Sequence, residues 1–123
     1  MPDTSIAHGG SFLFAPPAAD AVFTPEQLSD DHRAIAATAD EFWRRDVSPV
    51  LDALLRHEPG VAREALRKSA GLGLTAMQVS EADGGLELDL PSVMIAIEHL
   101  AVDPSYLGWH LGHTGIGMMP LVL

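Results

Sequence analysis

Apolar side chains recur at three- and four-residue steps between residues 35 and 55, the spacing of one face of an α-helix. The members of this stripe are Ile35, Ala39, Phe42, Trp43, Val47, Val50, Leu51, Leu54 and Leu55. Ser29-Asp30-Asp31 precedes the stripe and offers a cap, with acidic groups where the helix dipole favours them. Pro49 lacks an N–H and crowds the preceding turn. The pattern predicts one helix over about residues 30–56, bent near Ser48.

A second, shorter helix is expected after this one. Glu58-Pro59-Gly60 opens it, and the helical pattern runs through Leu66 to Ala70 before Gly71 or Gly73 closes it. Residues 74–79 form a short apolar stretch that is either extended or a helical turn. The Gly84-Gly85 pair then predicts a turn, because adjacent glycines permit positive φ.

Two further helices complete the pattern. Asp89 can cap the third, whose apolar face comprises Val93, Met94, Ile97, Leu100 and Ala101. Asp103-Pro104 starts a fourth segment that runs to the end of the chain. The predicted fold class is all-α, with about four main helices.

Residues 104–123 contain no Lys, Arg, Asp or Glu, a length that by itself would allow a membrane-spanning helix. His110, His113 and four glycines reduce its apolarity, and neither flanking positive charges nor an aromatic belt frames it. We therefore expect no membrane span. The segment is instead interpreted as a helix that is buried on all sides in a larger protein.

Composition narrows the classes of partner. Hydrophobic residues make up 47% of the 123 residues, which is typical of a globular chain of one domain. The formal net charge of -10 disfavours nucleic acid and anionic membrane surfaces. The absence of cysteine excludes a disulfide framework and a thiolate metal site.

Residues 1–22 are rich in Gly, Pro and Ala around an apolar island, Phe12-Leu13-Phe14. This composition predicts an extended leader, and residues 23–123 are then the domain. The first thirty-two residues contain no Lys or Arg, so they do not have the pattern of a signal or transit peptide. The expected location is the cytoplasm.

No catalytic constellation can be assembled from the residues alone. His110 and His113 share one helical face at i, i+3, but a third metal ligand would have to come from Glu98 or His99, and we predict no metal site. We interpret the two histidines as buried or partner-facing groups with ordinary hydrogen bonds. Glu98 lies among apolar residues, and we expect it to meet an arginine or a helix N-terminus.

From Phe23 onward, the order of motifs resembles the N-terminal helical domain of the acyl-CoA dehydrogenases. The matching stretches are 23–27 with Ile35 and Phe42, Val47-Ser48-Pro49, "LRKSAGLGL" (66–74), "VSEADGGLEL" (79–88), "AIEHLA" (96–101) and "GWHLGHTGIGMMPLVL" (108–123). Gly9-Gly10-Ser11-Phe12-Leu13 also resembles the leader of bacterial long-chain members. The sequence departs from the family at Ser80, where proline is common, and at Asp83, where an aromatic residue often precedes the two glycines.

The resemblance implies a function that this chain does not carry alone. Members bind FAD and remove two hydrogens from the α and β carbons of an acyl-CoA, with a glutamate base and the flavin as hydride acceptor. The flavin and the glutamate belong mostly to a middle β-domain and a C-terminal helical bundle. No catalytic residue and no flavin ligand is therefore assigned here, and the isolated chain is expected to bind FAD weakly or not at all.

The resemblance also suggests substrate-binding residues. Aligning the last helix on its Met-Pro pair places Gly108, Trp109, Gly112 and Ile116 on the wall of the acyl-chain channel. Residues 108, 112 and 116 share one helical face, and two glycines there leave depth for a longer acyl tail. The alternative is that these glycines permit close packing of helices.

Three functional hypotheses remain open. The first is the N-terminal domain of an FAD-dependent acyl-CoA dehydrogenase of fatty acid β-oxidation, present as a fragment. The second is a stand-alone helical module that binds a partner chain or an acyl group. The third is one subunit of a split dehydrogenase. The expected partners are acyl-CoA, and either the missing flavin and C-terminal domains or a second copy of the chain.

Overall fold

The computed structural model describes residues 24–122, and every regular element in that range is helical. The expected leader, residues 1–22 with its apolar island, lies outside the described residues. The elements are η2 (Pro25–Gln27), α1 (Asp30–Phe42), η3 (Trp43–Val47), η4 (Ser48–Val50), α2 (Leu51–Leu55), α3 (Val61–Gly71), η5 (Glu81–Asp83), α4 (Leu90–Leu100), α5 (Pro104–Leu111), η6 (Gly112–Ile116) and α6 (Met119–Val122). The predicted all-α class is confirmed, with α1, α3, α4 and α5 as the main helices.

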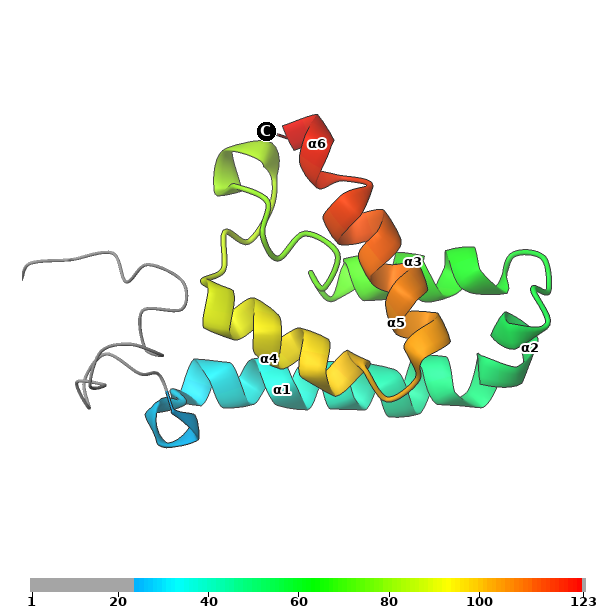
Figure 1. Cartoon of the computed structure of the whole chain (residues 1–123), viewed down its shortest axis with the longest axis horizontal. Coiled ribbons are helices and arrows are strands. Elements are labelled where there is room, and N and C mark those ends of the chain that lie inside the picture. The colour runs from blue at the N-terminus through cyan, green and yellow to red at the C-terminus, as the bar shows by residue number, and fades with distance from the viewer. Residues whose placement is uncertain (1–23, 123) are drawn as a thin grey trace, which may run out of the picture.

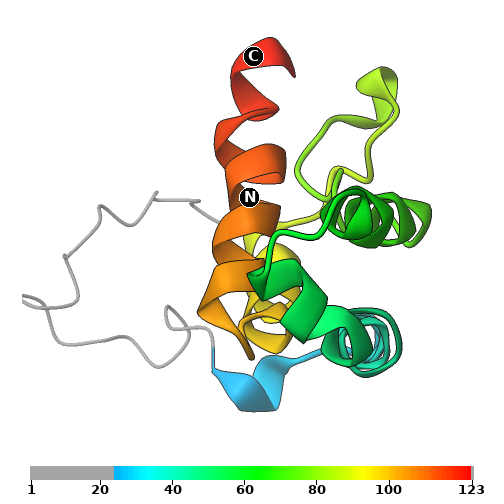
Figure 2. The ribbon, with the colours of Figure 1, turned by 90° about the vertical axis from the view of Figure 1, so that its right-hand side faces the viewer.

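The long first helix forms as predicted. Its interruption near Ser48 extends over two irregular turns, η3 and η4. Ser29 caps α1, because its hydroxyl accepts the His32 N–H at 3.2 Å. The helix widens to π geometry in η3, tightens to 3-10 geometry at Pro49 in η4, and resumes in α2. The wide turn ends with the Ser48 N–H bonded to the Trp43 carbonyl, immediately before the residue that has no N–H. Figures 1 and 2 show α1 as a straight rod and α2 turning away from its axis at the far end.

The remaining caps agree with the sequence. Gly60 is the N-cap of α3 with φ +86°, a conformation that suits glycine. Asp89 caps α4 by accepting the Ser92 N–H at 3.0 Å, and Asp103 caps α5 by accepting from Ser105 and Tyr106. The predicted glycine turn is also present, and a Cβ on Gly85 would collide with the Val79 carbonyl.

The core lies where α4 crosses α1 and where α3 and α5 close over them (Figures 1 and 2). The side chains with no exposed surface include Phe42, Val47 and Leu100. Two polar contacts fix this packing from outside the apolar layer. His99 on α4 donates to Asp40 on α1 at 2.8 Å, and Asp46 accepts from Lys68 on α3 at 2.9 Å.

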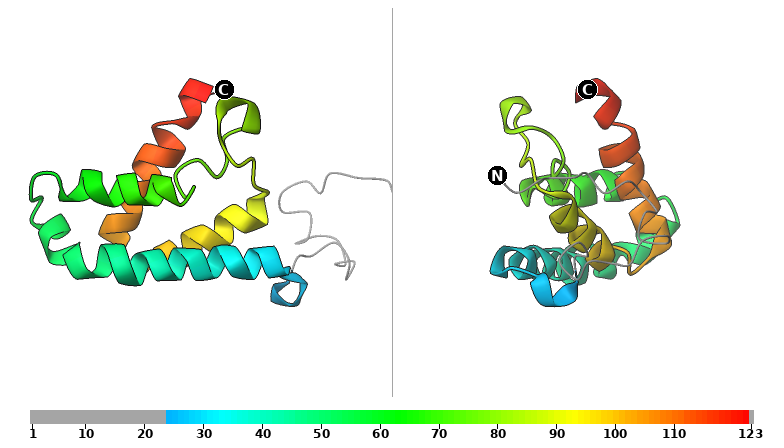
Figure 3. Two further views of the ribbon diagram at one scale, coloured as in Figure 1. Left: turned by 180° about the vertical axis from the view of Figure 1, so that it is seen from behind. Right: turned by 60° about the vertical axis from the view of Figure 1, so that its left-hand side comes forward.

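The last segment, residues 104–122, divides into two parts. Tyr106 and His110 of α5 are buried in this domain, whereas Ile116 and Leu121 are 80% and 84% exposed. Figure 3 shows α5 leaving the α1–α4 layer and rising toward α6. Within the described residues the first two turns are the most deeply buried, Thr114 and Met118 are half-buried, and Ile116 and Leu121 are exposed. Burial on all sides was expected in a larger protein and stays a prediction. No helix in residues 24–122 combines the length and apolarity that crossing a membrane requires.

Candidate functional site

The residues expected on a channel wall lie on the outer side of α5 and its continuation. Gly108 and Gly112 are exposed, and a Cβ built on either glycine would meet nothing within 4 Å. Ile116 follows along the same side and is also exposed. We call Gly108, Gly112 and Ile116 the glycine strip. No described part of the chain packs on it, so close helix packing within residues 24–122 does not explain the two glycines.

Trp109 belongs to the neighbouring side of α5. Its indole is half-buried and stacks at 4.7 Å, between ring centroids, on the imidazole of His113. The His113 Nδ1–H donates to the Trp109 carbonyl at 2.8 Å, which ties the two residues together over one turn. The structure thus places three of the four expected residues on the strip and turns the fourth toward a groove.

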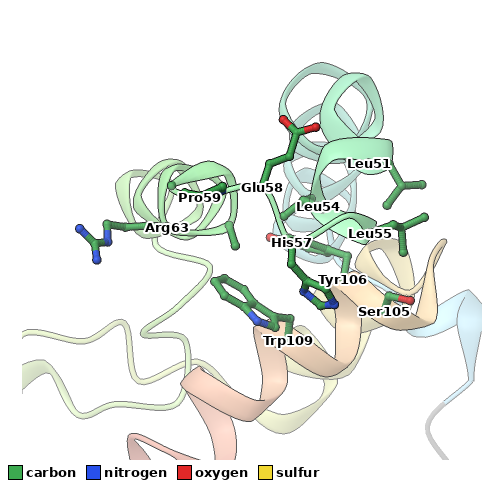
Figure 4. Close-up of a pocket in the computed structure, with 12 residues that line it drawn as sticks. Leu51, Leu54, Leu55, His57, Glu58, Pro59, Arg63, Ser105, Tyr106 and Trp109 are labelled. Atoms are coloured by element: carbon green, nitrogen blue, oxygen red, sulfur yellow. The ribbon is translucent and has the colours of Figure 1, made fainter.

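This groove lies between the α2–α3 turn and α5 and has a volume of about 640 Å³. Figure 4 shows Trp109 and His57 reaching into it from opposite sides. We call it the α2–α5 groove, and its lining residues are Leu51, Leu54, Leu55, His57, Glu58, Pro59, Gly60, Ala62, Arg63, Ser105, Tyr106 and Trp109. Sites of this size and composition accommodate small molecules in many proteins.

Burial separates the lining residues into a floor and a rim. The floor is buried or half-buried and consists of Leu51, Leu54, Ala62 and Tyr106, and the half-buried indole of Trp109 stands at its edge beside His57. The rim is exposed and carries the charged groups Glu58 and Arg63, whose side chains point away from the centre of the groove in Figure 4. The groove therefore presents an apolar floor that suits an uncharged, hydrophobic ligand.

A buried polar network holds α5 against the rest of the domain. The His110 Nε2–H donates to the Leu74 carbonyl at 3.2 Å, which leaves Nδ1 of the neutral ring to accept the Tyr106 hydroxyl at 3.4 Å. Burial lowers the pKa of His110 and raises the pKa of Tyr106 to about 12. The Ser69 hydroxyl is buried nearby and has no hydrogen-bond partner at normal distance within residues 24–122. These groups remain neutral near pH 7 and position the inner face of α5.

The structure shows the surroundings of the histidine pair and of Glu98, the two candidate chemical groups of the sequence. His110 is the buried histidine with ordinary hydrogen bonds that the sequence suggested, and His113 is exposed. Within residues 24–122, no three His, Asp or Glu side chains gather as a metal site would need. Glu98 is exposed on the outer side of α4 and pairs with no arginine or helix N-terminus in that range. The expected structural role of Glu98 therefore has no partner within residues 24–122 and stays a prediction.

Sequence analysis missed the α2–α5 groove. Leu51 and Leu54 belong to the first apolar stripe and were assigned to a helix face without a separate role. The feature that could have predicted the groove is Glu58-Pro59-Gly60, which ends the first helical stripe and turns the chain. Because of this turn, no helix within residues 24–122 packs directly on the last residues of the stripe. The distance along the sequence from these residues to Trp109 concealed their proximity.

Comparison with known proteins gives three concordant results. The family described as "Acyl-CoA dehydrogenase, N-terminal domain" matches residues 29–123. A "Probable acyl-CoA dehydrogenase" of Bacillus subtilis (strain 168) is 33% identical over 117 residues, which are 95% of this chain and 20% of that protein. The crystal structure of an acyl-CoA dehydrogenase complexed with FAD from Bacillus anthracis has a TM-score of 0.88 and 37% identity, covering 94% of this chain and 20% of that one. The chain thus spans about a fifth of the length of each relative.

Proposed function

The chain belongs to the acyl-CoA dehydrogenase family as its N-terminal domain, and from this premise we propose that it forms one wall of the acyl channel of an FAD-dependent dehydrogenase. In this proposal the substrate is an acyl-CoA of fatty acid β-oxidation, and the domain comprises residues 23–123. Gly108, Trp109, Gly112 and Ile116 face the acyl chain. A cytoplasmic location is part of the proposal and rests on the sequence alone.

The glycine strip is the observation that carries this proposal. Gly108 weakens its helix by about 1 kcal/mol relative to alanine, yet no described residue approaches it closely enough to require glycine. Exposed Ile116 continues the strip in a part of the domain that has little cover of its own. A surface with missing side chains beside exposed apolar groups suits a ligand or another domain that lies close to the backbone. Gly108 and Gly112, one turn apart on the same face, leave room along the helix for a long acyl chain.

FAD, when bound, accepts the hydride in this chemistry, and residues of this domain do not fit it as a binding site. The floor of the α2–α5 groove has no cationic group, and Arg63 at the rim points away from the groove. A pyrophosphate needs backbone N–H groups or cations that converge on it. We therefore assign flavin binding to other domains and expect the purified chain to contain no flavin and to reduce no dye with acyl-CoA.

Exchange of domains tests the channel wall. The corresponding fifth of the Bacillus anthracis enzyme is replaced by this chain, and acyl-CoA-dependent dye reduction is measured. Gly112→Leu should lower kcat/KM for hexadecanoyl-CoA by about tenfold or more, because it fills the strip with a side chain that displaces methylene groups of the substrate. Butanoyl-CoA should be affected less.

Gly71→Leu is the matched control for this substitution. Gly71 is also exposed, and a Cβ there also meets nothing within 4 Å, but it lies at the end of α3 away from the strip. It should leave both substrates unaffected. Equal losses for the two substrates with Gly112→Leu, or an unchanged preference, would contradict the channel-wall proposal.

A further inference from the structure

The glycine strip and the α2–α5 groove are adjacent surfaces of one helix. At about 100° per residue, Gly108, Gly112, Ser105 and Trp109 follow one another around α5 within roughly a quarter to a third of a turn. The two glycines begin this arc, and Ser105 and Trp109, which line the groove, end it. No side chain of α5 stands between the strip and the groove other than the short Ser105 and the indole of Trp109.

We propose that the α2–α5 groove receives the distal end of a long acyl chain that lies on the glycine strip, and that Trp109 controls the passage between the two surfaces. This inference rests on the proposed function, because it needs an acyl chain on the strip. It adds a second compartment whose walls come from the α2–α3 turn, which the strip does not touch. Trp109 is then a residue that determines specificity for chain length.

The floor of the groove suits the end of an alkyl chain. Leu51, Leu54 and Ala62 expose aliphatic surface to it, and Tyr106 presents its ring with the hydroxyl turned to the buried His110. A carboxylate or a phosphate would find no partner on this floor, and every methylene group that leaves water there contributes favourably to binding. A volume of about 640 Å³ lies within the range of pockets that bind small molecules.

The turn that forms the opposite wall holds a residue in an uncommon conformation. His57 has φ +55° and closes α2 where glycine is the usual residue. Its N–H bonds to the Leu54 carbonyl at 3.0 Å and the next N–H, of Glu58, bonds to the Ala53 carbonyl at 3.0 Å, so the conformation is fixed. The imidazole consequently projects over the groove beside Trp109 (Figure 4). Trp109 and His57 together narrow the mouth of the groove.

Photoaffinity labelling of the 123-residue chain tests the inference. Two hexadecanoyl-CoA probes are compared, one with a diazirine near the middle of the alkyl chain and one with a diazirine at its terminal carbon. After illumination, mass spectrometry of the peptides locates the label. The mid-chain probe should label residues 108–116, as the proposed function requires. The terminal probe should label residues 51–62, as the groove requires.

Variants then separate the two surfaces. Ala62→Phe fills the floor of the groove and should reduce terminal labelling of residues 51–62 by about tenfold, the loss expected when about two methylene groups stay in water. Trp109→Ala should increase the same labelling because it widens the passage. Leu55→Glu, at the exposed rim, offers a second way to disfavour the alkyl chain if Ala62→Phe unfolds the domain. Leu90→Glu is the control, because Leu90 is exposed on α4 outside the groove.

The outcomes distinguish this inference from the proposal on which it rests. Mid-chain labelling of residues 108–116 with terminal labelling elsewhere would overturn the groove and leave the channel wall intact. Absence of labelling at both places would overturn both. Cross-links that join residues 51–62 of two copies of the chain would assign the groove to self-association and would also overturn the inference.

Discussion

The seam between α1 and α4 and the end of the chain beyond α5 contrast in how they bury their apolar side chains. At the seam, Phe42 and Leu100 have no exposed surface, and the His99–Asp40 hydrogen bond closes one side of the contact. Beyond α5, Ile116 and Leu121 expose most of theirs. Within residues 24–122 the domain therefore covers its own core and leaves the strip and Leu121 uncovered. Its stability and its function should respond to different residues.

Substitution in the seam should have the largest effect. Phe42→Ala removes a ring that is fully buried against Tyr106, with ring centroids 6.2 Å apart, and should lower the free energy of unfolding by about 3–5 kcal/mol. Ile116→Ala should change it by less than about 0.5 kcal/mol, because its side chain is already in water. Urea denaturation followed by circular dichroism measures both. Similar losses for the two variants would show that the end of the chain is also part of the core.

Acid should weaken the attachment of α5 to the seam. Burial lowers the pKa of His110 below its unfolded value near 6.5. The charge of His113 adds to this lowering, and the hydrogen bond to the Leu74 carbonyl opposes it. His110 therefore binds a proton more readily in the unfolded chain than in the folded one. The stability that neutral, buried His110 contributes is fully present above pH 6.5 and is lost as the pH falls below it. The slope attributable to one group is at most about 1.4 kcal/mol per pH unit.

His110→Gln provides the comparison for this pH effect. The variant does not titrate in this range, so its stability should fall less steeply between pH 6.5 and pH 5 than that of the natural chain. Thermal unfolding at a series of pH values measures the difference. Parallel curves for the two proteins would show that other groups cause the acid sensitivity.

Local chemistry explains why the helices could be predicted and why the contacts between them could not. Ser29, Asp89 and Asp103 cap helices through hydrogen bonds to residues two or three positions away, so the sequence next to each is sufficient. The His99–Asp40 contact joins residues 59 positions apart and exists only after α4 has crossed α1. The π geometry of η3 was likewise not predicted, because Pro49 specifies an interruption without specifying its form.

The candidate site divides in the same way. The glycine strip follows from helical spacing and from the family resemblance, and the structure places Gly108 and Gly112 together in the open. The groove depends on how the α2–α3 turn meets α5. The seam and the groove both require tertiary structure, whereas caps and faces require only sequence.

The uncovered end should make the isolated chain associate. Ile116 and Leu121 present apolar surface that nothing in residues 24–122 covers, and exposed apolar patches favour contact between copies. Analytical ultracentrifugation should show dimers or larger species at high micromolar concentration. Ile116→Asp with Leu121→Asp should shift the chain toward monomer without loss of helical signal. Deleting residues 104–123 is less informative, because Tyr106 and His110 would be lost from the core with them.

A natural chain that remains monomeric at these concentrations, with no binding of an apolar dye, would contradict this prediction. The control is Leu90→Asp, which removes an exposed leucine at the start of α4, outside residues 104–122. It should leave the association unchanged.

The smallest expected effect comes from adding one methyl group to a glycine, and its sign tests the contrast between the complete and the open regions. Gly108→Ala should raise the free energy of unfolding by up to about 1 kcal/mol, because alanine favours the helix and the new Cβ meets nothing within 4 Å. Gly85→Ala should lower it, because its Cβ would collide with the Val79 carbonyl. Thermal unfolding of the two variants gives both signs. A destabilising Gly108→Ala would mean that the strip supports the fold. A stabilising one that also impairs acyl-CoA turnover in the domain-exchange enzyme would show that the glycine serves the ligand at the expense of the helix.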